Sequence, residues 1–112
     1  MDHRHDKRLV WLRGEIKTPP FSSSARIAAG LLLRRLQRGD ELGMPHSRAL
    51  PSVGAGCHEL RVVDDRRSWR IVYYVTAKEI VILHVFAKKS RKAPKRIIDV
   101  CRLRLRAFLD AN

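Results

Sequence analysis

The sequence has few cysteines, few acidic residues and no long apolar run. Cys57 and Cys101 stand far apart and outside any CxxC or Cys/His spacing, so neither a zinc site nor a disulfide framework is indicated, and two buried thiols are expected. The longest apolar stretch is too short to span a bilayer, and the charged start MDHRHDKR is not that of a signal peptide. No second pair of carboxylates accompanies Asp64 and Asp65, as a two-metal nuclease would need. We therefore expect a cytoplasmic protein with no metal, no cofactor and no membrane partner.

Positive charge is what the sequence has in excess. Lys and Arg number 24 against 11 Asp and Glu, which gives a formal net charge of +13 over 112 residues. Residues 57–112 carry 14 of these cations and 6 acids, and so supply +8 of the charge. Such a balance is unusual for an enzyme of small metabolites and favours a polyanionic partner. The length suits one domain, which we take to span residues 1–112.

The first half of the chain predicts a strand, a helix and a long loop. Leu9 to Leu12 favour a first strand that ends at Gly14. A helix is predicted over residues 24–38, where one of three serines before it serves as the cap and Gly39 suits the stop. Its expected apolar stripe consists of Ile27, Ala28, Leu31, Leu32 and Leu36, with most of the arginines on the other side. Residues 39–56 have the Gly, Pro and Ser content of a loop.

The second half predicts a small antiparallel sheet followed by a helix. Three apolar segments begin at Cys57, Trp69 and Ile80, and the turns between them are short enough for hairpins. After Pro94 a helix is predicted to pack on the sheet through Ile97, Cys101, Leu105 and Phe108. The expected fold class is therefore α+β, with an amino-terminal helix and a carboxy-terminal helix on an antiparallel sheet.

The segment ILHVFAKKSRKAP runs from an apolar strand straight into a series of cations. Lys88 and Lys89 end the strand, and further cations follow at Arg91, Lys92, Lys95 and Arg96. Because a helix start prefers acids, cations there favour a phosphate ligand over a purely structural role. By alternation, Arg61 projects from the polar face of its strand, and Arg70 on the neighbouring strand could complete a basic floor. A solvated turn is the alternative, and the charge of the whole chain disfavours it.

A basic site of this kind suits RNA cleavage without a metal. The RNA 2′-hydroxyl is a built-in nucleophile, so the protein need only orient it, stabilise the phosphate and manage two protons. A lysine crowded by other cations loses its proton more easily and can act as the base, although the sequence does not say which lysine does so. His84 is an outside candidate on an apolar strand, and Tyr74 is a candidate to stack on a base, although core packing is the commoner fate of both residue types.

Two segments resemble the RelE/HigB-like toxins, in the branch often labelled as phage-derived. They are CHELRVVDDRRSWRIVYYV and IVILHVFAKKSRKAPKRIIDVCRLRL, which carry an E-L-R strand, a W-R strand and an F-x-K-K-x-x-K-x-P segment in the family's order. The resemblance covers residues 57–105, and the loop before them is also similar. His58, Ser90, Ala93 and Ile97 depart from the usual pattern, and the general acid and base stay open.

The resemblance implies a RelE/ParE-like fold and an endoribonuclease that cuts messenger RNA on the ribosome. It also implies a cognate antitoxin, commonly a helix-turn-helix protein, with which such toxins form oligomers. Carried over by motif, the expected catalytic residues are Arg61, Arg70, Lys88 and Lys89. The expected RNA-binding residues are Lys92, Arg91, Lys95, Tyr74 and His84.

Two other functions stay open from the sequence. A chain of the same fold could inhibit a DNA topoisomerase through protein contacts, as ParE-like toxins do. A basic module could also bind nucleic acid without any catalysis, with an affinity that falls steeply as salt rises.

Overall fold

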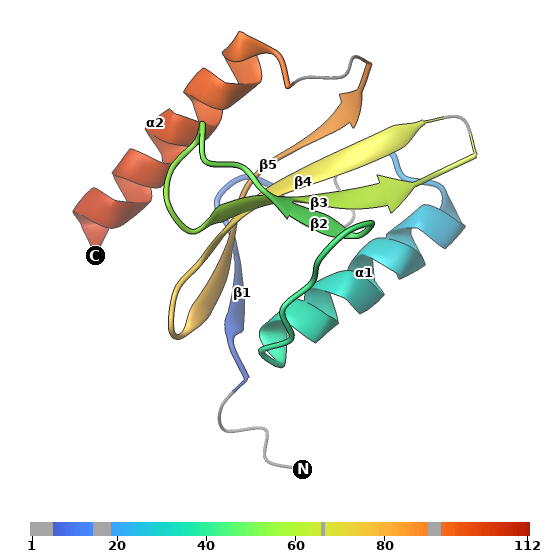
Figure 1. Ribbon diagram of the computed structural model, residues 1–112, viewed down its shortest axis with the longest axis horizontal. Coiled ribbons are helices and arrows are strands. Elements are labelled where there is room, and N and C mark those ends of the chain that lie inside the picture. Colours follow the sequence, from blue (N-terminus) through green and yellow to red (C-terminus); the bar gives the residue numbers. More distant parts are fainter. Residues whose placement is uncertain (1–5, 15–18, 66, 90–92) are drawn as a thin grey trace.

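The protein folds as a five-stranded sheet with a helix on each face, which confirms the expected α+β class (Figure 1). The computed structural model describes residues 6–14, 19–65, 67–89 and 93–112. The elements follow in the order β1 (Arg8–Trp11), α1 (Ser23–Gln37), β2 (Ser47–Ala49), β3 (Cys57–Val63), β4 (Ser68–Val75), β5 (Glu79–Lys88) and α2 (Lys95–Ala111). Neither of these helices combines the length and the apolar character needed to cross a membrane, over the described ranges.

The sheet is mixed, where the sequence predicted an antiparallel one. Its strand order is β1-β5-β4-β3-β2, and β1 pairs with β5 in parallel while the other neighbours are antiparallel. The expected meander of β3, β4 and β5 is confirmed. The predicted loop is wrong in one part, because Ser47–Ala49 pair with residues 58–60 of β3. A three-residue strand of mainly small and polar residues carries no alternation by which it could be predicted.

Helix α1 covers one face of the sheet, but with a different stripe from the predicted one. Its cap is confirmed, because the Ser22 hydroxyl accepts a hydrogen bond from the Ala25 backbone N–H at 3.1 Å. The exposed fractions of Ile27 and Leu31 are 65% and 63%, so these two predicted core residues are wrong. The small side chains of Ala25 and Ala29 are buried instead, together with Leu33 and Leu36. Small residues let the helix approach the sheet closely, and the apolar residues on both sides of α1 left its orientation ambiguous in the sequence.

Helix α2 packs on the opposite face with the predicted stripe. Ile97, Cys101 and Leu105 are buried in a cluster with sheet residues Cys57, Val72, Val81 and Leu83, and Phe108 packs at its edge. Both cysteines are free and buried, as expected. Burial raises the pKa of the Cys57 thiol to about 11 and that of Cys101 to about 12, so both remain protonated at neutral pH. These contacts involve the central part of the sheet, and β3 and β4 continue beyond them toward Asp64 and Arg67, whose backbones are hydrogen-bonded to each other.

Candidate nucleic-acid interface

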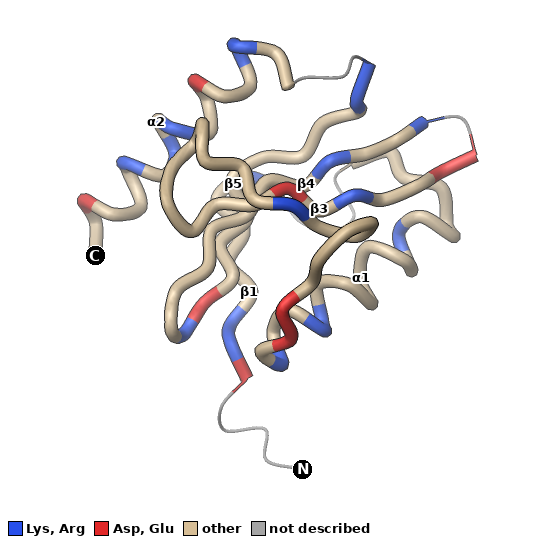
Figure 2. Tube along the Cα trace, in the orientation of Figure 1, with Lys and Arg blue, Asp and Glu red and all other residues tan. Residues whose placement is uncertain are grey.

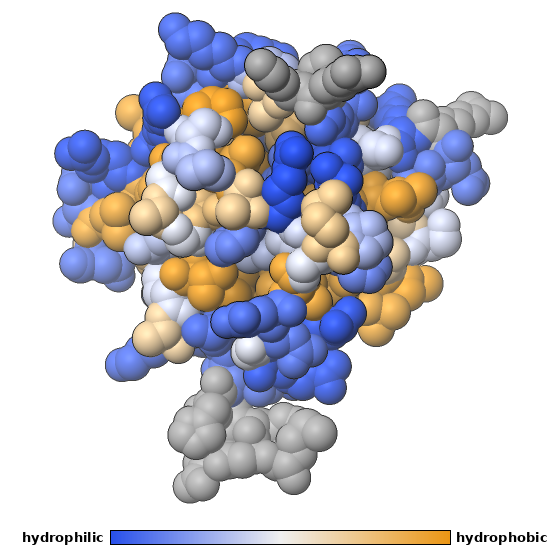
Figure 3. Space-filling view, in the orientation of Figure 1, coloured by the Kyte–Doolittle hydropathy of each residue, from blue (hydrophilic) through white to orange (hydrophobic). Residues whose placement is uncertain are grey.

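Four cations gather on the α2 side of the sheet, beyond the part that α2 covers. Figure 2 shows blue segments of β3 and β4 side by side there, and Figure 3 shows a hydrophilic patch over the same strands. We call this group the cation cluster. It consists of Arg48 on β2, Arg61 on β3, Arg70 on β4 and Lys88 on β5, with Glu59 of β3 among them.

Strand register brings the cluster together. Arg61 is the direct partner of Arg70, and Arg70 is in turn the partner of Phe86. Directly opposed side chains on one face have Cβ atoms about 4.5 to 5.5 Å apart. Lys88 pairs with Ser68 and therefore lies diagonally from Arg70 on the same face. The cations thus project from backbone that three antiparallel ladders hold in place.

A buried carboxylate lies inside the cluster. Glu59 is 1% exposed, and its Oε1 accepts hydrogen bonds from Arg48 Nε at 3.2 Å and from Arg48 Nη2 at 2.9 Å. Arg70 Nε lies 3.7 Å from the same oxygen, and Arg70 Nη1 donates to the Trp69 carbonyl at 3.0 Å. Glu59 therefore compensates part of the positive charge and links β2 to β4.

Two guanidinium N–H groups of the cluster are left without a hydrogen bond. The Nε atoms of Arg61 and Arg70 are buried and have no hydrogen-bond partner in the described part of the chain. An unpaired buried donor costs about 1 to 3 kcal/mol, and more when it is charged. Burial is the main cause that lowers the pKa of Arg70, and the charges of Arg61 and Arg48 add to it against the opposing effect of Glu59. An anion beside the cluster would offset this repulsion.

Lys88 is the cluster's titratable lysine. Burial and then the charge of Arg70 lower its pKa below the ordinary 10.5, and Arg48 and Arg61 act in the same direction. The carboxylate of Glu59 acts in the opposite direction. Lys88 therefore gives up its proton more readily than a solvated lysine, as a base in acid–base catalysis must.

The structure brings three of the four expected catalytic residues together. Arg61, Arg70 and Lys88 share one face, whereas Lys89 is exposed one residue past the end of β5. Lys95 is exposed at the first position of α2. Arg91 and Lys92 lie outside the described residues, so their expected contacts with RNA stay predictions.

His84 and Tyr74 lie toward α2 rather than within the cluster. Arg104 Nη1 donates to His84 Nδ1 at 2.9 Å, so His84 presents an unprotonated Nδ1. Burial, followed by the charges of Arg104 and Arg96, lowers the pKa of His84 and favours the neutral ring. Tyr74 packs edge-on against Phe108, with the ring centroids 6.4 Å apart, and lies four residues along β4 from Arg70, a distance of about 13 Å.

Sequence reasoning did not assign Arg48 or Glu59 to the site. Arg48 lies in the segment that was predicted as a loop, and nothing in the sequence gave its partner. Glu59 did carry a signal, because it shares the polar face of β3 with Arg61 by alternation. That Glu59 is a buried acid between arginines can be recognised only when β2 and β4 are placed beside β3.

The opposite face of the sheet carries a cavity and no comparable group of cations among its lining residues. The cavity has a volume of about 450 Å³, lies next to the end of α1, and is lined partly by His58 and Tyr73. The two rings stack with centroids 5.3 Å apart, so His58 lies on the same face as Leu60. Over the described ranges, no three His, Cys, Asp or Glu side chains are grouped so that they could hold a metal ion.

The family of the chain follows from a comparison of its sequence with family models. The model of the phage-derived protein Gp49-like family (DUF891) matches residues 19–106. The chain belongs to this family. The Gp49-like match includes every residue of the cation cluster and the whole sheet except β1. A comparison with the curated proteins finds no match. The match confirms the phage-derived part of the resemblance seen in the sequence motifs, and the RelE/HigB assignment stays a prediction.

Proposed function

We propose that this chain is the toxin of a type II toxin–antitoxin system and acts as a ribosome-dependent endoribonuclease. The observation that carries the proposal is the arrangement of Arg61, Arg70 and Lys88, which three neighbouring strands place on one face. Arg61 and Arg70 each have an Nε–H group without a hydrogen-bond partner among the described residues, and their positive charges suit a phosphate. Membership of the phage-derived Gp49-like family and the motif resemblance to RelE/HigB-like toxins support the same function.

The proposed reaction needs no metal ion. The RNA 2′-oxygen attacks the adjacent phosphorus, the bond from phosphorus to the 5′-oxygen breaks, and the products carry a 2′,3′-cyclic phosphate and a 5′-hydroxyl. Neutral Lys88 accepts the 2′-hydroxyl proton, and a solvent water donates one to the leaving 5′-oxygen, so the protons balance. Arg61 and Arg70 stabilise the charge that develops on the phosphate oxygens.

The proposed partners follow from the charge and from the family resemblance. Messenger RNA on the ribosome supplies the polyanion that a chain with a net charge of +13 favours. A cognate antitoxin, a helix-turn-helix protein that forms an oligomer with this chain, would neutralise the toxin in the cytoplasm. A gene for such a protein beside the gene of this chain would support this part of the proposal.

The decisive experiment maps transcript ends after a short induction of the chain in cells. Fresh ends within translated codons, together with growth arrest, are expected for the wild type and not for the Arg61→Ala, Lys88→Ala double variant. The matched control is an Arg106→Ala, Lys78→Ala variant, which removes the same two residue types from exposed positions outside the cluster. It should cut like the wild type.

Other outcomes identify the remaining alternatives. Growth arrest without fresh ends, accompanied by DNA damage, would point to a ParE-like topoisomerase inhibitor. Binding to ribosomes without cutting, in a purified system, would point to a non-catalytic nucleic-acid-binding module. Equal harmlessness of the wild type and the double variant would overturn the proposal.

A further inference from the structure

The cation cluster contains an acid where a phosphate site would gain from having none. Glu59 is buried at the centre, and its charge opposes the binding of any anion nearby. Taking a carboxylate out of water is costly, and a buried ion pair is often no more stable than a well-packed apolar pair. The stability of the fold alone is therefore a weak reason for its presence.

We propose that Glu59 is a positioning residue that keeps Arg48 in an internal ion pair and leaves Arg61 and Arg70 to hold the phosphate. This inference rests on the proposed function of the cluster as an RNA site. The cations of the cluster therefore have different roles, which the amino-acid composition cannot distinguish.

The contacts of Arg48 and Arg70 with Glu59 are unequal. Two nitrogens of Arg48 donate to Glu59 Oε1, at 3.2 and 2.9 Å, so most of the carboxylate's hydrogen bonding goes to Arg48. Arg70 Nε is 3.7 Å from that oxygen, which is too long for a hydrogen bond, and a backbone carbonyl anchors Arg70 instead. Arg70 therefore retains an unpaired donor, whereas Arg48 has its Nε and Nη2 engaged.

The location of Arg48 explains why it needs such a restraint. It lies on the short edge strand β2, and its side chain is 43% exposed, so without Glu59 its long side chain could reach toward a bound strand. The Nε of Arg61 is buried and has no hydrogen-bond partner among the described residues, and the Arg61 backbone is anchored because its N–H donates to the His46 carbonyl at 2.7 Å. Glu59 thus keeps Arg48 away from the phosphate that Arg61 and Arg70 bind.

Lys88 links this arrangement to the chemistry. The Glu59 carboxylate counteracts part of the effect of the arginines on Lys88. Removing the carboxylate while keeping the side-chain shape should therefore lower the pKa of Lys88 further. A Lys88 titration followed by NMR detects this change whether or not the chain cleaves RNA.

The salt dependence of RNA binding reports how many cations of the protein contact phosphate groups. Each phosphate contact adds about 0.7 to the slope of log Kd against log salt for a single strand. The probe is a single-stranded 2′-O-methyl RNA oligonucleotide, which cannot be cleaved by 2′-oxygen attack. Glu59→Gln should steepen the slope by about 0.7 because Arg48 becomes free, and an added Arg48→Gln change should restore the wild-type slope.

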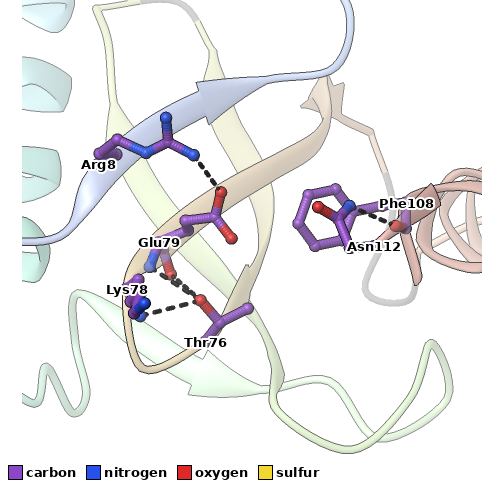
Figure 4. Close-up of polar contacts among 6 residues, drawn as sticks. All are labelled: Arg8, Thr76, Lys78, Glu79, Phe108 and Asn112. Carbon is purple, nitrogen blue, oxygen red and sulfur yellow. Dashed lines mark hydrogen bonds and ion pairs between the residues drawn. The ribbon is translucent and has the colours of Figure 1, made fainter. Parts of the chain in front are cut away.

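The matched control is Glu79→Gln. Glu79 also pairs with an arginine, at 2.8 Å from Arg8, but on the β1 edge of the sheet (Figure 4). This variant removes the same charge from a similar pair outside the cluster. Its slope should match that of the wild type, as should the pKa of Lys88.

A second variant keeps the test valid if Glu59→Gln does not fold. The double variant Arg48→Gln, Glu59→Gln, which leaves no charge of this pair buried without its partner, should keep the wild-type slope, whereas Arg61→Gln should reduce it by about 0.7. Equal reductions by both would overturn the role of Glu59, as would an unchanged slope in a folded Glu59→Gln protein. A steeper slope for Glu59→Gln without any cleavage by the wild type would refute the endoribonuclease and leave the role of Glu59 intact.

Discussion

Arg61 lies directly opposite Arg70 across the β3–β4 ladder, so two guanidinium groups share one face of the sheet. Like charges in directly opposed positions destabilise a sheet. Each arginine also buries an Nε atom that has no hydrogen-bond partner among the described residues. The pair therefore costs stability in the free protein, as is typical of a site where the ligand supplies the missing charge.

Replacing Arg61 by methionine should separate stability from activity. Arg61→Met keeps an apolar stem and removes the like-charge contact, so the free energy of unfolding should rise by about 0.5 kcal/mol. Cleavage on ribosomes should fall about a hundredfold to a thousandfold, because a preorganised charge is lost. Urea denaturation and single-turnover cleavage measure the two effects. Arg106→Met on the exposed side of α2 is the control, and a marked loss of stability in Arg61→Met would contradict the interpretation.

The pH dependence of cleavage tests Lys88 as the base. The neutral lysine is the active form, so the rate should rise with pH and level off above the pKa of Lys88. Because that pKa is lowered, the plateau should come below the ordinary value of 10.5. Lys88→Arg keeps the charge but holds its proton, so it should lower the rate at least a hundredfold and abolish this rise. Lys78→Arg, at an exposed turn, should keep the wild-type profile.

Two leucines of α1 test which face of the helix packs on the sheet. Leu33 is 2% exposed and Leu31 is 63% exposed, although they are two positions apart. Leu33→Ala should lower the free energy of unfolding by about 2 to 5 kcal/mol, because it removes buried methyl groups and leaves a cavity. Leu31→Ala should change it by less than about 0.5 kcal/mol. Urea denaturation of both variants checks the assignment, and the reverse order would restore the stripe predicted from the sequence.

Asp64 should make stability depend on pH in the acid range. Hydrogen bonds from the side chain and the backbone N–H of Ser22 are the main causes that lower its pKa from 3.8 to about 2. A group with a lowered folded-state pKa stabilises the protein fully above its unfolded value, and this stabilisation is lost as pH falls from about 3.8 to 2.

Thermal unfolding between pH 2 and 6 measures the effect of Asp64. Asp64→Asn should show a smaller decrease in Tm across the acid range than the wild type. Asp110→Asn, at the exposed end of α2, should keep the wild-type decrease. Identical curves for Asp64→Asn and the wild type would show that the contact between Ser22 and Asp64 contributes nothing.

Local sequence patterns predicted most of the helices and strands, because each of these patterns depends only on residues that are close in the sequence. Strand alternation placed Glu59 and Arg61 on one face of β3 and Leu60 and Val62 on the other, as found. The stripe of α2 was equally clear, since charged residues fill most of its other positions. In α1, apolar residues at 27–29 and 31–33 fit more than one face, and only contact with the sheet decides among them.

The candidate site could be predicted from the sequence only where the pairing of its strands could be predicted. Arg61 and Arg70 lie on strands joined by a short turn, so their proximity follows from the hairpin. Lys88 and Lys89 look equivalent in sequence, but only Lys88 belongs to the strand and faces the arginines. Arg48 reaches the cluster through a three-residue strand whose partner no local pattern specifies.

The pairing of β1 with β5 has a consequence for the order of assembly during translation. Arg8 and Glu79 form their ion pair across 71 positions, and β5 is the only strand beside β1 in the described part of the chain. A nascent chain must therefore hold its first strand unpaired until β5 has been made. Long-range contacts of this kind also slow folding. Lys88 comes at the end of that late strand, so a growing polypeptide lacks a complete cluster while most of its own message is being read.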